Sequence, residues 1–177
     1  MPEINTFKEL FMGLTRAHGS YVINDERADG KKQGRATTIR EEVTDEKWTQ
    51  HLNGVHGLGI IPINDDSSCR FGAIDVDQYD GLNFGKINQK IEDFKLPLWP
   101  CMSKSGGVHL YLFTSEWVSA ELMQRKLRDM AAALGFGGSE IFPKQTHILA
   151  DRGDVGQWIN MPYFGKERWC NNMDPKT

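Results

Sequence analysis

Two aspartates separated by one apolar residue form the pattern with the clearest chemical meaning. Residues 73–77 read Ala-Ile-Asp-Val-Asp, so Asp75 and Asp77 alternate with aliphatic side chains. On a β-strand, side chains at i and i+2 project from the same face, which places the two carboxylates side by side. Close carboxylates repel each other unless a cation lies between them, and Mg²⁺ or Mn²⁺ prefers such hard oxygen ligands. The pattern indicates a divalent-metal site; two solvated acids at the end of a strand are the alternative.

A glycine- and serine-rich segment follows later in the chain. Residues 103–109 read Ser-Lys-Ser-Gly-Gly-Val-His. Glycines let backbone N–H groups approach an anion, serine hydroxyls add hydrogen-bond donors, and the lysine adds positive charge. The segment predicts a phosphate-binding turn followed by a strand, with an ordinary glycine turn as the alternative. The candidate nucleotide contacts are Ser103, Lys104, Ser105, Gly106 and His109.

A third segment, Glu140-Ile-Phe-Pro-Lys-Gln, adds an acid and a base at the edge of another predicted strand. Glu140 is a candidate third metal ligand beside the two aspartates. Lys144 is a candidate contact to the nucleotide or the template. Asp151 and Asp154 compete with Glu140 for the ligand role, although the Asp-Arg-Gly-Asp sequence that contains them is equally typical of a turn.

Apolar periodicity and capping residues predict a mixed α+β fold in which a sheet carries helices on one side. We expect helices over residues 6–16, 44–52, 84–94 and 119–134. We expect strands over residues 58–63, 70–76, 97–100, 107–113, 140–143 and 157–163. Ser119 and Gly135 fit the N-cap and C′ positions of the longest helix. Residues 65–68 predict a hairpin turn, and residues 24–37 a polar, basic, glycine-bearing loop.

Composition narrows the classes of protein that the chain can belong to. Its 177 residues fit one domain, and 39% hydrophobic with 25% charged residues is ordinary for a soluble protein. A net charge of −3 argues against a protein that coats DNA through a broad basic surface. No apolar run is long enough to cross a membrane, so we expect a cytoplasmic protein. Cys69, Cys101 and Cys170 lack metal-ligand spacing, which predicts three reduced thiols.

The order of the three segments resembles the archaeo-eukaryotic primase superfamily. Residues 48–54, 57–63, 140–145 and 156–164 are further similar to its primase-polymerase branch in phages, plasmids and mobile elements. The likeness extends over about residues 6–165, with one departure: the family's third acid is usually Asp, whereas this chain has Glu140. The implied fold is an RRM-like mixed or antiparallel sheet flanked by helices. It is expected in a catalytic domain of residues 1–170, with an N-terminal αβ portion (1–56), a metal- and nucleotide-binding portion (57–165) and a tail (171–177).

The resemblance implies two-metal phosphoryl transfer by a template-directed nucleotidyltransferase, a DNA primase, a DNA polymerase or both. The metal ligands would be Asp75, Asp77 and Glu140, and the phosphate contacts Ser103, Ser105, His109 and Lys144. The implied partners are a single-stranded DNA template with its primer, and NTPs or dNTPs. A helicase in trans, or on a further C-terminal part, is a further expected partner. A monomer in the cytoplasm, of the host cell if a phage encodes it, is the expected state.

Contacts to nucleic acid are less sharply indicated. Lys31, Lys32 and Arg35 form the best basic segment for phosphate contacts, although a solvated loop has the same composition. Asn160 alternates with Trp158, so its side chain is expected to point into the site as a nucleotide contact, whereas Trp158 and Tyr163 are expected to pack in a core.

Two other classes of protein remain open from sequence. A metal-dependent nuclease also uses paired carboxylates but has no need for a triphosphate-binding turn. A non-catalytic nucleic-acid-binding module on a primase fold is the second, against which the intact acids and His109 argue. De novo priming versus extension, and NTP versus dNTP preference, are not decided by the sequence.

Overall fold

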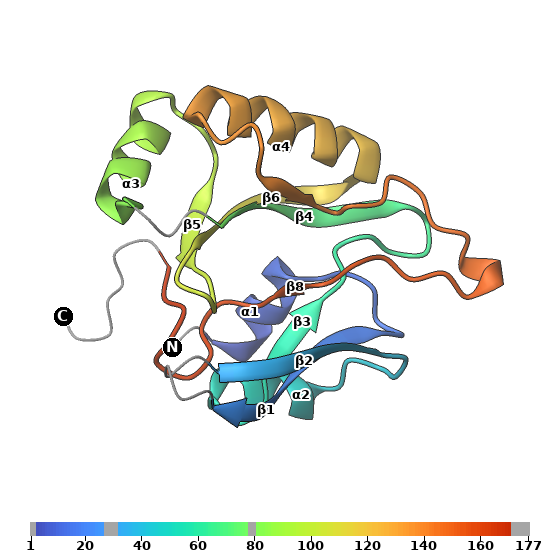
Figure 1. Ribbon diagram of the computed structural model, residues 1–177. Helices are drawn as coiled ribbons and strands as arrows, with labels where there is room; N and C mark the ends of the chain where they lie inside the picture. Colours follow the sequence, from blue (N-terminus) through green and yellow to red (C-terminus); the bar gives the residue numbers. More distant parts are fainter. Residues whose placement is uncertain (1–2, 27–31, 78–80, 171–177) are drawn as a thin grey trace.

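The computed structural model describes residues 3–26, 32–77 and 81–170, with residues 22–26 and 32–34 described by their backbone alone. Two antiparallel four-stranded sheets, in the orders β2-β1-β3-β8 and β5-β6-β4-β7, form the molecule (Figure 1). The strands are β1 His18–Glu26, β2 Lys32–Ile39, β3 Leu58–Ile60, β4 Ser68–Val76, β5 Trp99–Met102, β6 Val108–Ser119, β7 Glu140–Phe142 and β8 Ile159–Asn160. The helices are α1 Ile4–Leu10, α2 Asp45–Leu52, α3 Phe84–Asp93, α4 Ala120–Leu134 and the 3₁₀ turn η1 Ala150–Arg152. The expected α+β class is confirmed.

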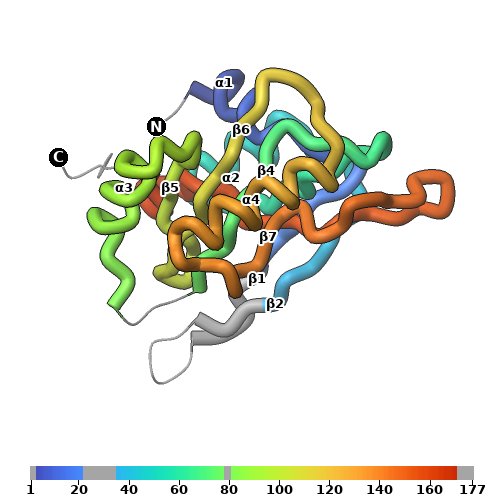
Figure 2. Tube along the Cα trace, turned by 90° about the horizontal axis from the view of Figure 1, so that it is seen from above, coloured from blue at the N-terminus to red at the C-terminus, as the bar shows by residue number. Residues whose placement is uncertain are grey.

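Helices α3 and α4 cover one face of the second sheet, as Figures 1 and 2 show from two directions. Ile74 and Val76 of β4 and Leu110 of β6 point to this face, where they share a core with Ile87 of α3 and Leu127 of α4. Side chains alternate between the faces of a strand, so every second residue of β4 and β6 belongs to this apolar layer. This core holds the central strands β4 and β6 in place, so the side chains on their opposite face are firmly positioned.

The opposite face of the second sheet packs toward the N-terminal part of the chain. Ala73 of β4 and Tyr111 of β6 belong to a second core with Phe7 of α1 and with Leu58 and Ile60 of β3. Aromatic rings fill much of the contact between α1 and this sheet; Phe11 lies 5.0 Å from Tyr111, centroid to centroid. Asp75 shares the strand face of Ala73, and His109 that of Tyr111, because each pair is two residues apart. The candidate catalytic groups therefore lie on the inner face.

The capping signals predict the helices well. Ser119 Oγ accepts a hydrogen bond from the Leu122 N–H at 3.2 Å, and Gly135 ends α4 with φ of 85°. The first helix is shorter than the predicted span of 6–16, since α1 ends at Leu10. Beyond it, the Leu14 N–H donates to the Ile61 carbonyl oxygen at 2.9 Å, so this stretch runs beside the segment that follows β3.

Two expectations about loops are wrong. Within the predicted loop 24–37, residues 27–31 lie outside the described part of the chain, while the described residues 24–26 and 32–37 belong to β1 and β2, which pair for example Glu26 with Lys32. Their polar composition reflects an edge strand, which has only one neighbour to pack against. Residues 65–68 do not close a hairpin, since β3 and β4 belong to different sheets. The turn is instead organised by Asn64, whose Oδ1 accepts hydrogen bonds from Asp66 and Ser68.

The expectation of three reduced thiols is also wrong. Cys101 of β5 and Cys170 form a disulfide, across an isolated antiparallel bridge between residues 69 positions apart in sequence. Pairing over such a distance depends on the folded chain and leaves no spacing signal. Cys69 is free and buried, and burial raises the pKa of its thiol to about 12. None of the helices in the described part of the chain has the length and apolar character needed to cross a membrane.

Candidate active site

Three predicted site residues lie in one row across the second sheet. Asp75 of β4 is paired in register with His109 of β6 on one side and with Glu140 of β7 on the other. Residues directly opposite each other on antiparallel strands project from the same face, within about 5.5 Å of each other. Positions separated by more than 30 residues along the chain therefore meet as immediate neighbours. Strand register alone produces this arrangement.

Asp75 has one carboxylate oxygen, Oδ1, whose hydrogen-bonding capacity is not used within the described residues. Its side chain is 18% exposed, and within the described residues its Oδ1 is buried without a hydrogen bond. His109 Nε2 lies 3.3 Å from this oxygen but is not aligned for a hydrogen bond. An unsatisfied buried carboxylate oxygen is costly, and a bound cation would remove that cost. Asp77 follows directly after β4 and is exposed, so the two carboxylates fit the oxygen donors that Mg²⁺ or Mn²⁺ requires.

Glu140 is engaged elsewhere. Its Oε2 forms an ion pair with Lys144 Nζ at 2.7 Å, and the Lys144 backbone is fixed by Gln124, which donates to the carbonyls of Pro143 and Lys144. Within residues 3–26, 32–77 and 81–170, no three His, Cys, Asp or Glu side chains are gathered closely enough to hold a metal ion. The row thus presents Asp75 and His109 on adjacent strands, with its second acid, Glu140, held by a lysine.

The competing acids lie at the other end of β4. Arg16 binds the Asp65 carboxylate at 2.8 Å and also the Asp154 carbonyl oxygen, which places Asp154 near the start of β4. Asp75 lies near the end of that strand. The loop that carries η1 and Asp151 projects from the end of the molecule opposite α3 (Figures 1 and 2). Of these acids, only Glu140 is a neighbour of Asp75 across the sheet.

The predicted phosphate-binding turn joins β5 to β6 and packs against the end of β4. The Ser103 N–H donates to the Gly107 carbonyl at 2.9 Å, and Gly106 adopts a left-handed φ of 93°. A Cβ on Gly107 would lie 2.4 Å from the Val76 carbonyl oxygen, so only glycine fits there. Ser103 is buried, and its Oγ lies 3.1 Å from Ser105 Oγ. The turn therefore adjoins the residue that separates the two aspartates.

Lys104 lies against an aromatic ring of the first sheet. Its ammonium group lies over the ring of Tyr21, 2.8 Å from the centroid, as in a cation–π contact. Burial lowers the pKa of Lys104, with the nearby Tyr21 acting in the opposite direction. Tyr21 belongs to β1, so this contact joins the turn of the second sheet to the first sheet.

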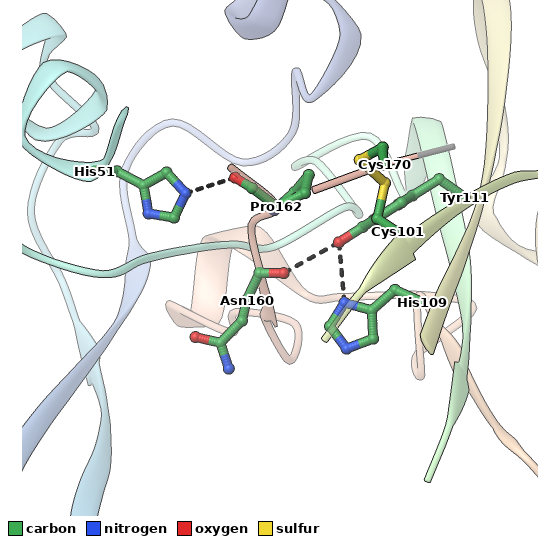
Figure 3. The surroundings of a disulfide bond; sticks show 7 residues. All are labelled: His51, Cys101, His109, Tyr111, Asn160, Pro162 and Cys170. Atoms are coloured by element: carbon green, nitrogen blue, oxygen red, sulfur yellow. Dashed lines mark hydrogen bonds between the residues drawn. A yellow bond between two sulfur atoms is a disulfide. The ribbon is translucent and has the colours of Figure 1, made fainter. Parts of the chain in front are cut away.

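A hydrogen-bonded chain continues from the row into the first sheet (Figure 3). His109 Nδ1 lies 3.1 Å from the Tyr111 hydroxyl, which donates to the Asn160 carbonyl oxygen at 3.1 Å. His109 is 6% exposed and Tyr111 is fully buried. Burial, followed by the proximity of Asp75, raises the pKa of Tyr111 well above its ordinary value, so the phenol stays protonated. Sequence reasoning missed Tyr111, although its position two residues after His109 on a strand was a signal that both share one face.

Comparison with known proteins decides the family. The family described as "TOTE conflict system, Archaeo-Eukaryotic Primase domain" matches residues 3–173. This chain belongs to the archaeo-eukaryotic primases. The solved AEP domain of the cyanophage S-2L primase-polymerase has the same fold as this primase domain, with a TM-score of 0.52 at 14% identity over 96% of this chain and 88% of that one. A search of curated proteins found no match. The family resemblance predicted from the three segments is confirmed.

The predicted nucleic-acid contacts of this primase domain are only partly described. Lys31 lies outside the described residues, and Lys32 begins β2 with a side chain that is not described. Arg35 is exposed on β2, the edge strand of the first sheet. His51 is buried and bonded at both ring nitrogens, to the Pro162 carbonyl and the Leu58 N–H, so its role is structural. Trp158 and Tyr163 pack against the two cores, as predicted.

Proposed function

We propose that this primase domain is a template-directed nucleotidyltransferase, a primase-polymerase that joins nucleotides on single-stranded DNA. The observation that carries the proposal is the row of Asp75, His109 and Glu140 on adjacent strands, with the Ser103–Gly107 turn packed at its end. A carboxylate with one buried oxygen that lacks a hydrogen bond, beside a serine- and glycine-rich turn, provides a negative site for metal next to a donor-rich site for phosphate.

Each of these residues has a distinct task in the proposed reaction. Asp75 and Asp77, with Glu140 as third ligand, would hold Mg²⁺ or Mn²⁺. When bound, such ions offset the charge of the triphosphate and activate a 3′-hydroxyl for attack. His109 Nε2 and the hydroxyls of Ser103 and Ser105 would orient the phosphate oxygens, for which proximity and alignment supply much of the rate.

Lys144 and Lys104 are two further cations at this site, and each already contacts a partner within the protein. Lys144 balances the charge of Glu140. It would contact a phosphate once Glu140 turns to a metal. Lys104, held over Tyr21, would contribute positive potential at the β5–β6 turn. Because both lie close to partners already, we expect each to tune nucleotide affinity rather than to determine it.

Residues 1–170 act in this proposal as one catalytic unit. The first sheet combines β1 and β2 from the N-terminal portion with β3 and β8 from the central portion, so the two portions share a sheet. Arg35, with Lys31 and Lys32, would contact the phosphates of the template or primer. The setting would be replication of a phage or mobile element, or the conflict system that the family description names.

Primer extension tests the proposal. Wild type and the Asp75→Ala/Asp77→Ala variant are incubated with a primed single-stranded template, Mg²⁺ or Mn²⁺, and either NTPs or dNTPs. We expect template-directed extension by the wild type and none by the variant, with a primer-free lane reporting de novo initiation. Degradation of the template by folded protein would favour a nuclease. Binding of the template without incorporation under any condition would favour the non-catalytic module.

A further inference from the structure

Tyr111 is a fully buried polar group that the proposed reaction does not use. It lies in the aromatic core between the sheets, with Phe11 packed edge-on at 5.0 Å and Phe113 stacked at 6.1 Å. A phenylalanine would satisfy that packing equally well. The hydroxyl is therefore retained for its hydrogen bonds, since a buried polar group without partners is destabilising.

The partners of this hydroxyl fix the orientation of the His109 ring. The Asn160 carbonyl oxygen can only accept, so the single hydroxyl proton of Tyr111 points to it. The Tyr111 oxygen also lies 3.1 Å from His109 Nδ1, so the ring is held at this nitrogen. Nε2 is left as the nitrogen that faces Asp75.

The same hydroxyl fixes the distance between two strands of different sheets. His109 belongs to β6 of the second sheet and Asn160 to β8 of the first. Figure 3 shows the side-chain amide of Asn160 pointing away from Tyr111, to the side on which His109 Nε2 also lies. Tyr111 thus connects the backbone of one predicted nucleotide contact to the ring of the other.

We propose that Tyr111 is a positioning residue: its hydroxyl, bonded to His109 Nδ1 and to the Asn160 carbonyl oxygen, holds the ring so that Nε2 lies in register with the Asn160 amide for one triphosphate. The part of this inference that concerns the substrate rests on the proposed function. The hydrogen bonds themselves do not depend on that function. The two parts can therefore be tested separately.

The hydrogen-bond arrangement is tested on the wild-type protein without substrate. Nitrogen-15 NMR of labelled histidine, correlated through the ring protons, separates the Nδ1 and Nε2 resonances of His109, assigned with a His109→Gln variant. We expect the Nδ1 resonance to move in Tyr111→Phe, because its hydroxyl partner is removed, and to stay in place in Tyr163→Phe. An unchanged His109 spectrum in Tyr111→Phe would overturn the proposal.

The consequence for substrate is tested with Tyr111→Phe against Tyr163→Phe, which removes a hydroxyl from the same core outside this chain of hydrogen bonds. We expect the dissociation constant and KM for nucleotide to rise about 10-fold in Tyr111→Phe, the effect of losing one buried hydrogen bond to a charged site, with kcat changed less. Tyr163→Phe should keep wild-type values. Equal effects of the two variants would show a structural role only. Absence of nucleotide incorporation by wild type would defeat the proposed function while leaving the NMR result to decide the arrangement.

Discussion

Two buried histidines meet the same short segment, residues 160–162, and use their nitrogens differently (Figure 3). His51 donates from Nε2 to the Pro162 carbonyl at 2.7 Å and accepts from the Leu58 N–H at Nδ1, so both of its nitrogens are bonded within the protein. His109 is connected to the Asn160 carbonyl through Tyr111 at Nδ1 only, and its Nε2 faces a carboxylate oxygen, Asp75 Oδ1, that has no hydrogen bond. A histidine satisfied at both nitrogens supports the fold. One satisfied at a single nitrogen keeps the other for a ligand.

The largest expected effect comes from Asp75, the neighbour that distinguishes His109 from His51. Asp75→Asn keeps the shape but removes the charge, so we expect polymerisation to fall about 10³-fold, a size typical of lost transition-state charge stabilisation. The free energy of unfolding should stay equal or rise, because an unsatisfied buried carboxylate is removed. Primer extension and chemical denaturation measure the two quantities. A matched Asp66→Asn variant in the exposed turn at the far end of β4 should change neither.

Exchanging the two histidines for alanine should separate activity from stability. His109→Ala should lower polymerisation about 10²-fold while costing about 1 kcal/mol of unfolding free energy, since one hydrogen bond is lost. His51→Ala should cost about 3 kcal/mol, since it leaves a buried carbonyl and a buried N–H unpaired and opens a cavity. Its activity per folded molecule should be retained. Similar profiles for both variants would contradict the distinction.

Lowering the pH should destabilise the folded protein through His51. Burial lowers its pKa from 6.5 to about 4, with the nearby Arg168 acting in the same direction. Between these values the unfolded chain binds a proton that the folded protein excludes, so stability is full above pH 6.5 and falls as pH drops toward 4. The expected loss is about 3 kcal/mol, because one unit of pKa difference corresponds to about 1.4 kcal/mol. Burial also lowers the pKa of His18, so the difference between the wild-type and His51→Phe curves isolates the His51 part. Parallel curves would contradict this assignment.

The smallest effect is expected at the exposed edge of the row. Lys144→Ala breaks an ion pair with Glu140, whose side chain is 57% exposed, so stability should change by less than about 1 kcal/mol. We expect nucleotide KM to rise by about 3-fold, from loss of one screened phosphate contact. Glu121→Ala on the exposed side of α4 serves as the control for losing a surface charge. A loss of activity approaching that of Asp75→Asn would give Lys144 a larger role than the structure supports.

Much of the fold and part of the site could be predicted from the sequence because their signals are local. The alternation around Asp75 and Asp77, the Ser119 cap and the Gly135 terminus each depend on neighbours within one element. The family order of the three segments supplied the rest of the predicted site. Glu140 could be named as a candidate from this order, but its place beside Asp75 depends on the register of β7.

What the sequence did not disclose depends on contacts between distant segments. Tyr111 looks like any apolar strand residue until β8 brings the Asn160 carbonyl to its hydroxyl. The Cys101–Cys170 disulfide likewise needs the chain after β8 to return to β5. The β1–β2 pairing was obscured because polar residues are tolerated on an edge strand, where few side chains are buried. Each omission concerns a partner supplied by another strand.

The most direct test of the central claim is a crystal structure with Mn²⁺ and a non-hydrolysable nucleoside triphosphate. The account predicts an anomalous manganese peak bound by Asp75 and Asp77, with triphosphate oxygens against Ser103, Ser105 and His109 Nε2. Glu140 should have turned from Lys144 toward the metal. Manganese or nucleotide bound away from the row, with Asp75 still without a ligand, would contradict the claim.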